Sequence, residues 1–188
     1  MQVVLPPLGN PAAAIGNRRL NAMFVIRSAT PDDALGITIV NVYTWQTAYR
    51  GLMPERVIEE RIENLPIRAQ RCREALQESG NCFVAAEGNT VIGFCRYGAS
   101  RSASYPDAGE VYALYVLKGY SGTGAGRALL SAAMNALRAQ GYATMFINCL
   151  EGNPARGFYE HMGGQWVGNR TDELLGVSMT EDILLYSL

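Results

Sequence analysis

Runs of apolar and polar residues along the chain predict a mixed order of strands and helices. Apolar, β-rich runs predict strands at residues 24–27, 82–87, 90–97, 110–117, 143–150, 164–169 and 177–187. Helical spacing predicts helices after Thr30, over 54–77 with an interruption at Pro66, over about 127–140, and after Asn153. The strands at 110–117 and 143–150 flank one helix, so they form a βαβ crossover and should run parallel.

The ends and faces of the first two helical regions follow from local residue chemistry. Thr30 is suited to an N-cap with Pro31 at the first helical position, and Gly51 ends the helix. This helix is expected to turn four apolar side chains inward: Leu35, Ile39, Val42 and Tyr43. The region 54–77 is expected to carry its charged residues on the outer, solvent-facing side.

The most informative segment is the strand, loop and helix at residues 109–127. Its apolar strand leads into a loop that contains Gly122, Gly124 and Gly126, and an amphipathic helix follows directly. Glycine allows backbone N–H groups to turn toward a ligand without interference from Cβ. The N-terminus of the helix adds unpaired N–H donors and the positive end of the helix dipole. The segment therefore predicts an anion site, most typical of a phosphate or pyrophosphate.

Two common phosphate-binding motifs do not fit this loop. Gly119 and Gly124 have the spacing of a P-loop, but Ala125 stands where the P-loop lysine should be. A dinucleotide-binding fingerprint requires G-x-G-x-x-G, whereas Arg127 occupies the third glycine position after Gly122 and Gly124. The phosphate-containing ligand must therefore belong to another class.

Composition narrows the class of protein. The 188 residues include 16 basic and 17 acidic side chains, and the net charge of −1 predicts no nucleic-acid partner. No apolar stretch approaches the roughly 18–20 residues needed to span a bilayer, so we expect a cytoplasmic protein without a membrane partner. The four cysteines form no C-x-x-C pair and are accompanied by one histidine, His161, which predicts reduced thiols and no metal site.

The first 22 residues differ in character from the remainder. Three prolines, at positions 6, 7 and 11, prevent a continuous helix or a central strand there. Met23 begins a more domain-like stretch. We therefore expect residues 1–22 to be an N-terminal extension and residues 23–188 to form a single domain.

Two motifs resemble those of the GNAT superfamily of N-acetyltransferases. The loop Ser121–Gly126 is similar to the family motif Q/R-x-x-G-x-G/A, with Ser121 where Gln or Arg is usual. The block Asn153–Gly164 is similar to the family block N-x-x-A-x-x-F-Y-E-x-x-G-F, although its Asn and Tyr lie six positions apart instead of seven and Gly164 replaces the final Phe. The order of predicted elements over 24–188 also matches this family.

The resemblance implies both a fold and an acyl donor. The fold is α/β (α+β), with a mixed, mostly antiparallel sheet of about seven strands flanked by helices. The parallel βαβ crossover forms the site for acetyl-coenzyme A (acetyl-CoA), whose pantetheine arm pairs with the end of the first crossover strand and whose pyrophosphate binds the glycine loop. The residues implied to bind it are Leu114, Tyr115, Val116, Ser121, Gly122, Thr123, Gly124, Ala125, Gly126, Arg127 and Asn153.

Two residues are candidates for acid and base catalysis. By resemblance, Tyr159 lies near the sulfur of the donor, and a phenol with a pKa of about 10 can protonate a thiolate whose conjugate acid has a pKa of about 8.5. Glu110 begins the strand that should run beside the thioester and is the candidate base, acting through water. The alternative interpretations stay open: Tyr159 anchors its helix in the core, and Glu110 is a solvated residue at a strand end.

The acceptor site is predicted from aromatic residues near the first helix. Trp45 and Tyr49 are four residues apart and share a helix face, where they either line a pocket or pack two helices together. Tyr112 shares a strand face with Glu110 and is included in this site. His161 is expected to be structural or solvated. Cys149 is expected to be a buried, inert thiol, so direct transfer is favoured over an acyl-cysteine route.

These observations favour transfer of acetyl from acetyl-CoA to the amine of a small molecule in a ternary complex. A protein N-terminal or lysine acetyltransferase would require an open groove, against which the aromatic segment 45–54 argues mildly. A non-catalytic acyl-CoA sensor is the alternative from another class. A homodimer formed through the late strands is possible, but a core strand explains the apolar run Ile183–Tyr186 equally well.

Overall fold

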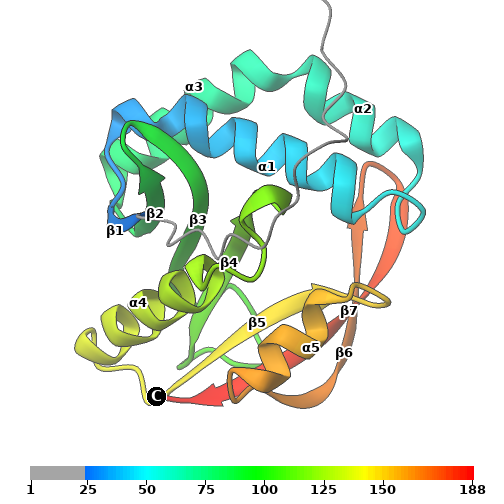
Figure 1. Cartoon of the computed structure of the whole chain (residues 1–188). Coiled ribbons are helices and arrows are strands. Elements are labelled where there is room, and N and C mark those ends of the chain that lie inside the picture. The colour runs from blue at the N-terminus through cyan, green and yellow to red at the C-terminus, as the bar shows by residue number, and fades with distance from the viewer. Residues whose placement is uncertain (1–23) are drawn as a thin grey trace, which may run out of the picture.

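The computed structural model describes residues 24–188, so the expected N-terminal extension at 1–22 lies outside the described residues. One seven-stranded sheet has the order β1-β2-β3-β4-β5-β7-β6 (Figure 1). Its strands are β1 (Val25–Ser28), β2 (Cys82–Glu87), β3 (Thr90–Ala99), β4 (Gly109–Val116), β5 (Thr144–Leu150), β6 (Gln165–Leu174) and β7 (Val177–Ser187). The predicted strands are thus confirmed, with ends that shift by a few residues.

Helices cover both faces of this sheet. They are α1 (Ala34–Ala48), α2 (Glu55–Glu63), α3 (Leu65–Glu78), α4 (Ala125–Ala139) and α5 (Ala155–His161). Leu129 and Leu137 of α4 pack with Ile92 and Met145 in one buried cluster. Ile37 of α1 and residues of α3 pack against the other face, in a second buried cluster. Among residues 24–188 no helix has the length and apolar character needed to cross a membrane.

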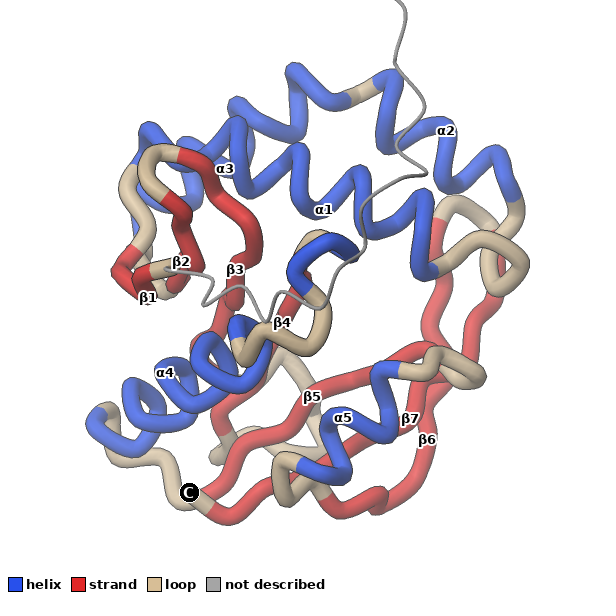
Figure 2. Tube along the Cα trace, in the orientation of Figure 1, coloured by secondary structure: helices blue, strands red, loops and turns tan. Residues whose placement is uncertain are grey.

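The neighbours β4 and β5 form the one parallel pair of the sheet, as the crossover predicts. Their pairing is short: it runs from Gly109↔Met145 to Val111↔Ile147 and then stops. Beyond that point β4 remains paired with β3, and β5 remains paired with β7. The two strands therefore diverge toward the C-terminal end of β4, and Figure 2 shows them parting there.

The inward face predicted for α1 is wrong at three of four positions. Val42 is buried, but Leu35, Ile39 and Tyr43 are 52%, 46% and 48% exposed. The buried face instead includes Ala34, Ile37, Val40 and Trp45. The reason is that α1 is apolar around most of its circumference, so hydrophobic spacing does not select one face. Contact with β3 and β4 selects it.

The departure at Gly164 from the family block has a steric cause. A Cβ built at this position would lie 2.8 Å from the ring carbon Cζ of Tyr186 and 2.9 Å from the carbonyl oxygen of Tyr159. The Tyr186 hydroxyl also donates a hydrogen bond to that carbonyl, at 3.0 Å. The ring of Tyr186 thus occupies space that a side chain at position 164 would need.

Substitution of Gly164 by Ala should therefore destabilise the protein. We expect the free energy of unfolding to fall by about 1–3 kcal/mol, because the methyl group overpacks a closed site that includes a backbone atom. Urea unfolding measures it. Gly157→Ala is the matched control, since Gly157 lies in α5 with nothing within 4 Å of a Cβ built there, and it should be neutral or slightly stabilising. A Gly164→Ala variant as stable as the wild type would contradict this account.

Candidate active site

The glycine loop lies at the start of α4 and has the conformation its sequence predicts. Gly122 and Gly124 have φ of 77° and 92°, in the left-handed region that favours glycine. Nothing lies within 4 Å of a Cβ built at either position, so this backbone faces open space. α4 begins at Ala125, directly after Gly124, so its free N–H groups lie beside the loop.

A cleft of about 470 Å³ runs from this loop along β4 to α5. Its lining residues are Leu114, Val116, Tyr120, Ser121, Gly122, Gly124, Gly126, Arg127, Ala155, Phe158 and Tyr159. On this side the last residues of β4 have no strand partner, because the pairing with β5 ends at Val111. The cleft thus combines an anion-binding loop with an unpaired strand edge and an apolar wall.

Three residues predicted to bind the donor lie at the edge of this cleft or behind it. The Thr123 hydroxyl donates a hydrogen bond of 2.7 Å to the Tyr120 carbonyl, and Ala125 is buried. The Asn153 side-chain oxygen accepts a hydrogen bond of 2.9 Å from the Ala155 N–H at the start of α5. Backbone groups of Thr123 and Ala125 remain part of the loop, while Asn153 shapes the turn that carries α5.

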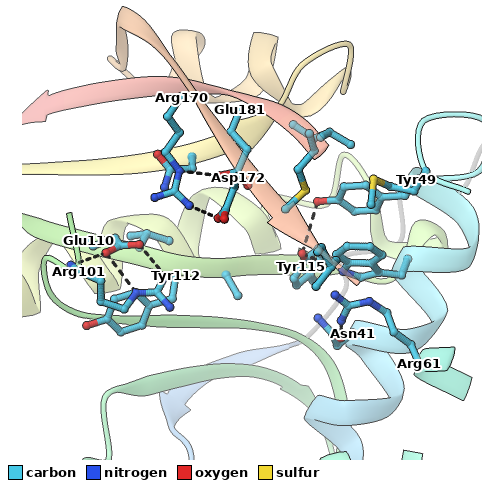
Figure 3. A pocket seen from close by; sticks show the side chains of 18 residues that line it. Asn41, Tyr49, Arg61, Arg101, Glu110, Tyr112, Tyr115, Arg170, Asp172 and Glu181 are labelled. Carbon is cyan, nitrogen blue, oxygen red and sulfur yellow. Dashed lines mark hydrogen bonds and ion pairs between the residues drawn. The ribbon is translucent and has the colours of Figure 1, made fainter. Parts of the chain in front are cut away.

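A second pocket, of about 500 Å³, lies on the other side of β4 (Figure 3). It is lined by residues of α1, α2, β4, β5, β6 and β7 and includes the three residues predicted for the acceptor, Trp45, Tyr49 and Tyr112. The rings of Trp45 and Tyr49 stack with centroids 4.3 Å apart. Trp45 also packs with Val57 and Arg61 of α2, so the aromatic pair both joins the two helices and lines a pocket.

The Tyr115 side chain points into this second pocket, away from the cleft that Leu114 and Val116 line. Its hydroxyl accepts a hydrogen bond of 3.1 Å from the indole N–H of Trp45 and lies 3.4 Å from the Tyr49 hydroxyl. Tyr115 was predicted to bind the donor. Its backbone belongs to the strand edge at the cleft, whereas its ring lines the second pocket.

Glu110 is buried, so the interpretation as a solvated strand-end residue is wrong. Its side chain is 3% exposed and pairs with Arg101, with 2.6 Å between Nη2 and Oε1. The backbone N–H of Arg101 donates to the other carboxylate oxygen at 2.8 Å. The Arg101 guanidinium also lies over the ring of Tyr112, 4.1 Å from its centroid. Tyr112 is the extra residue of a bulge in β4, and it lines the same pocket as Glu110.

A narrow space of about 40 Å³ lies between the cleft and the pocket. Its lining includes Leu114 and Tyr159, which also line the cleft, and Tyr49 and Tyr115, which also line the pocket. We call this space the junction. Burial raises the pKa of the Tyr159 hydroxyl well above its usual value, so at neutral pH it stays protonated. The same ring packs edge-on against Phe158, so Tyr159 also serves the core as the alternative interpretation supposed.

The structure adds pocket residues that the sequence analysis missed. Arg61 of α2 was expected on the outer face of its helical region with the other charged residues, and this is wrong: it is 9% exposed and lines the pocket. Asn148 of β5 lines both the pocket and the junction. Arg170 of β6 pairs there with Asp172 and with Glu181 of β7. No local sequence signal marks these residues, because strand pairing and helix packing bring them together.

Cys149 lines the junction, whereas His161 lies outside the residues that line the cleft, the pocket or the junction. His161 is exposed and contacts Arg127, with 3.2 Å between the two nitrogens. Burial raises the pKa of the Cys149 thiol to about 12, with a further increase from Asp182. Within residues 24–188 no three His, Cys, Asp or Glu side chains are grouped to hold a metal ion.

Comparison with known proteins agrees with the fold. Residues 42–164 match the model of the acetyltransferase (GNAT) family. The chain is 31% identical over 160 residues to YuaI of Bacillus subtilis, described as an uncharacterized N-acetyltransferase, covering 85% of this chain and 90% of that protein. This protein therefore belongs to the GNAT family of acetyltransferases.

Solved structures share the fold at low sequence identity. One is a GCN5-related N-acetyltransferase from Rhodopseudomonas palustris, at 18% identity and a TM-score of 0.71, covering 92% of this chain and 100% of that one. Another is the PaiA N-acetyltransferase from Thermoplasma acidophilum in complex with coenzyme A, at 18% identity and a TM-score of 0.67, covering 88% and 99%.

The burial of the cysteines leads to a testable prediction about the reactivity of their thiols. Burial raises the pKa of Cys82 and of Cys149 to about 12 and also raises that of Cys95, so these thiols stay protonated at pH 8. We expect iodoacetamide at pH 8 to label half-buried Cys72 first, and the other three only after urea unfolding. Mass spectrometry of labelled peptides measures this. Rapid labelling of Cys149 in the folded protein would reopen the acyl-cysteine route.

Proposed function

We propose that this protein transfers the acetyl group of acetyl-CoA directly to a primary amine of a small molecule. The observation that carries the proposal is the junction, where a cleft suited to a pantetheine arm meets a polar pocket across Tyr115 and Tyr159. Membership of the GNAT family and the coenzyme A bound to the Thermoplasma acidophilum relative support the choice of donor. The volume of the pocket, about 500 Å³, is within the range of small-molecule sites and favours a small acceptor over an extended protein segment.

The residues of the cleft fit acetyl-CoA. The amides of Gly122–Gly126 and the first turn of α4 would hold its pyrophosphate, since glycines there leave room for a ligand against the backbone. The strand edge at Leu114–Val116 has unpaired backbone groups on the cleft side, which suit the two amides of the pantetheine arm. Acetyl-CoA, when bound, supplies an acetyl group activated as a thioester.

The chain supplies the proton transfers that the reaction needs. Tyr159 lies in the junction with a protonated hydroxyl, so it is placed to protonate the sulfur of the leaving group. Glu110 lines the acceptor pocket, where Arg101 fixes the position of its carboxylate, and it would receive the proton of the acceptor ammonium through water. Because one group lines the junction and the other lines the adjoining pocket, no covalent intermediate with the enzyme is needed.

Gly124→Glu should abolish acetyl-CoA binding. The new side chain would place bulk and negative charge at the expected pyrophosphate position. Isothermal titration calorimetry of the folded variant measures the loss. Gly141→Glu is the matched control, because Gly141 has φ of 94°, against 92° at Gly124, with open space around both, and it lies at the opposite end of α4. Equal binding by both variants would place the donor elsewhere, and no binding by the wild type would overturn the proposed function.

Tyr159→Phe should lower kcat by about 100-fold or more while leaving the KM for acetyl-CoA little changed, since the phenol acts on the leaving group. Because the pKa of Tyr159 is raised, the wild-type rate should show no loss from this residue as pH rises from 7 to 9. Steady-state assays of thiol release measure both. An unchanged kcat in a variant of normal melting temperature would assign Tyr159 to the core alone.

A further inference from the structure

Arg61 is a buried cation without a counter-ion. Arg61 is 9% exposed. No carboxylate of residues 24–188 lies within 4 Å of its guanidinium. The sequence before residue 24 contains no Asp or Glu. Its Nε–H has no hydrogen-bond partner among the described residues. Burying a charge without a partner costs free energy. A ligand that supplies the missing counter-charge would offset this cost.

A second arginine increases this local positive charge. Arg61 Nη1 donates to the side-chain oxygen of Asn41 at 3.3 Å, and Arg68 Nη2 donates to the same oxygen at 3.4 Å. Burial and the neighbouring Arg68 lower the pKa of Arg61 to about 10, so it remains charged at neutral pH. Two guanidinium groups thus converge on one amide oxygen, and an anion beside them would relieve their mutual repulsion.

The other charged side chains of the pocket all have ion-pair partners. Among the three arginines and three carboxylates that line it, Arg101 pairs with Glu110, and Arg170 pairs with both Asp172 and Glu181. The pocket is therefore positive at the Arg61 end and carries one excess negative charge at the Arg170 end. Figure 3 shows Arg61 and Asn41 on one side of Tyr115. It shows Arg170, Asp172 and Glu181 together on another side.

From this arrangement we infer that the acceptor is a compact amino acid, an amine whose own carboxylate binds Arg61. A planar guanidinium donates two parallel hydrogen bonds to a carboxylate, and the Arg61 side chain lines the pocket in which the acceptor would bind. The inference rests on the proposed function and narrows it to one class of substrate.

Two contacts lead from Arg61 toward the junction. The guanidinium lies over the Trp45 ring, 3.4 Å from its centroid, and the indole N–H of Trp45 donates a hydrogen bond to the Tyr115 hydroxyl. Tyr115 and Asn148 line both the pocket and the junction. An acceptor whose carboxylate meets Arg61 would therefore extend past Trp45 toward Tyr115, where the acetyl group should arrive.

The test compares acceptors that differ only at the carboxylate. Wild-type protein with acetyl-CoA is assayed for thiol release with the standard amino acids, their carboxamides and the corresponding decarboxylated amines. We expect amino acids to be preferred by about 10- to 100-fold in kcat/KM, the loss typical of removing a charged hydrogen-bond partner. Arg61→Met should remove this preference mainly through KM, because Arg61 lies away from the reacting atoms. Arg61→Lys should restore part of it.

Arg56→Met is the matched control, because Arg56 lies on the same helix, is exposed and does not line the pocket. It should keep the wild-type preference. Melting temperatures of all variants separate a structural effect of the Arg61–Trp45 contact from recognition, since loss of stability alone would not change the ratio of amino acid to carboxamide.

A binding measurement makes the result independent of turnover. Calorimetric titration of each amino acid and its carboxamide into protein saturated with coenzyme A should show binding of the amino acid that Arg61→Met abolishes. Equal use of amines with and without a carboxylate, or no amino acid binding to the loaded protein, overturns the inference and leaves the proposed function standing. Failure of acetyl-CoA itself to bind would instead overturn the proposed function.

Discussion

The short pairing between β4 and β5 is the constraint on which the rest of the site depends. Two parallel strands that stayed paired along their full length would close the sheet and leave no edge for a ligand. Here the ladder ends after Val111 and Ile147, because β4 continues with β3 while β5 follows β7. The last residues of β4 therefore have free backbone groups that face the cleft, where a ligand can pair with them.

The side chains of β4 then divide the interior into two chemically different spaces. Leu114 and Val116 line the cleft that leads from the glycine loop, whereas the ring of Tyr115 lies in the pocket beneath α1 and α2. Successive side chains of a strand point to opposite faces, so a single strand can separate a donor from an acceptor. Tyr115 also links α1 to the sheet through Trp45 and Tyr49.

The elements of the fold and the donor side of the site could be predicted from the sequence, because their signals are local. The glycines at 122, 124 and 126 mark a strand-to-helix turn whatever surrounds it, and one intervening helix makes β4 and β5 parallel. The inward face of α1 could not be predicted, because that helix is apolar on most sides. Its orientation depends on the sheet it contacts.

The acceptor side depends on contacts between distant parts of the chain. Arg61 has the sequence context of a surface arginine among glutamates, and only the packing of α2 over Trp45 buries it. Glu110 is buried because the loop before β4 folds back and brings Arg101 to it. Residue type alone did not distinguish these positions from ordinary solvated charges.

A crystal structure with coenzyme A tests the central claim most directly, namely that donor and acceptor meet across the end of β4. The account predicts the pyrophosphate on the amides of Gly122–Gly126, the pantetheine arm along Leu114–Val116, and the sulfur within hydrogen-bonding distance of the Tyr159 hydroxyl. Coenzyme A bound outside this cleft, or a sulfur remote from the junction between Tyr115 and Tyr159, would contradict it.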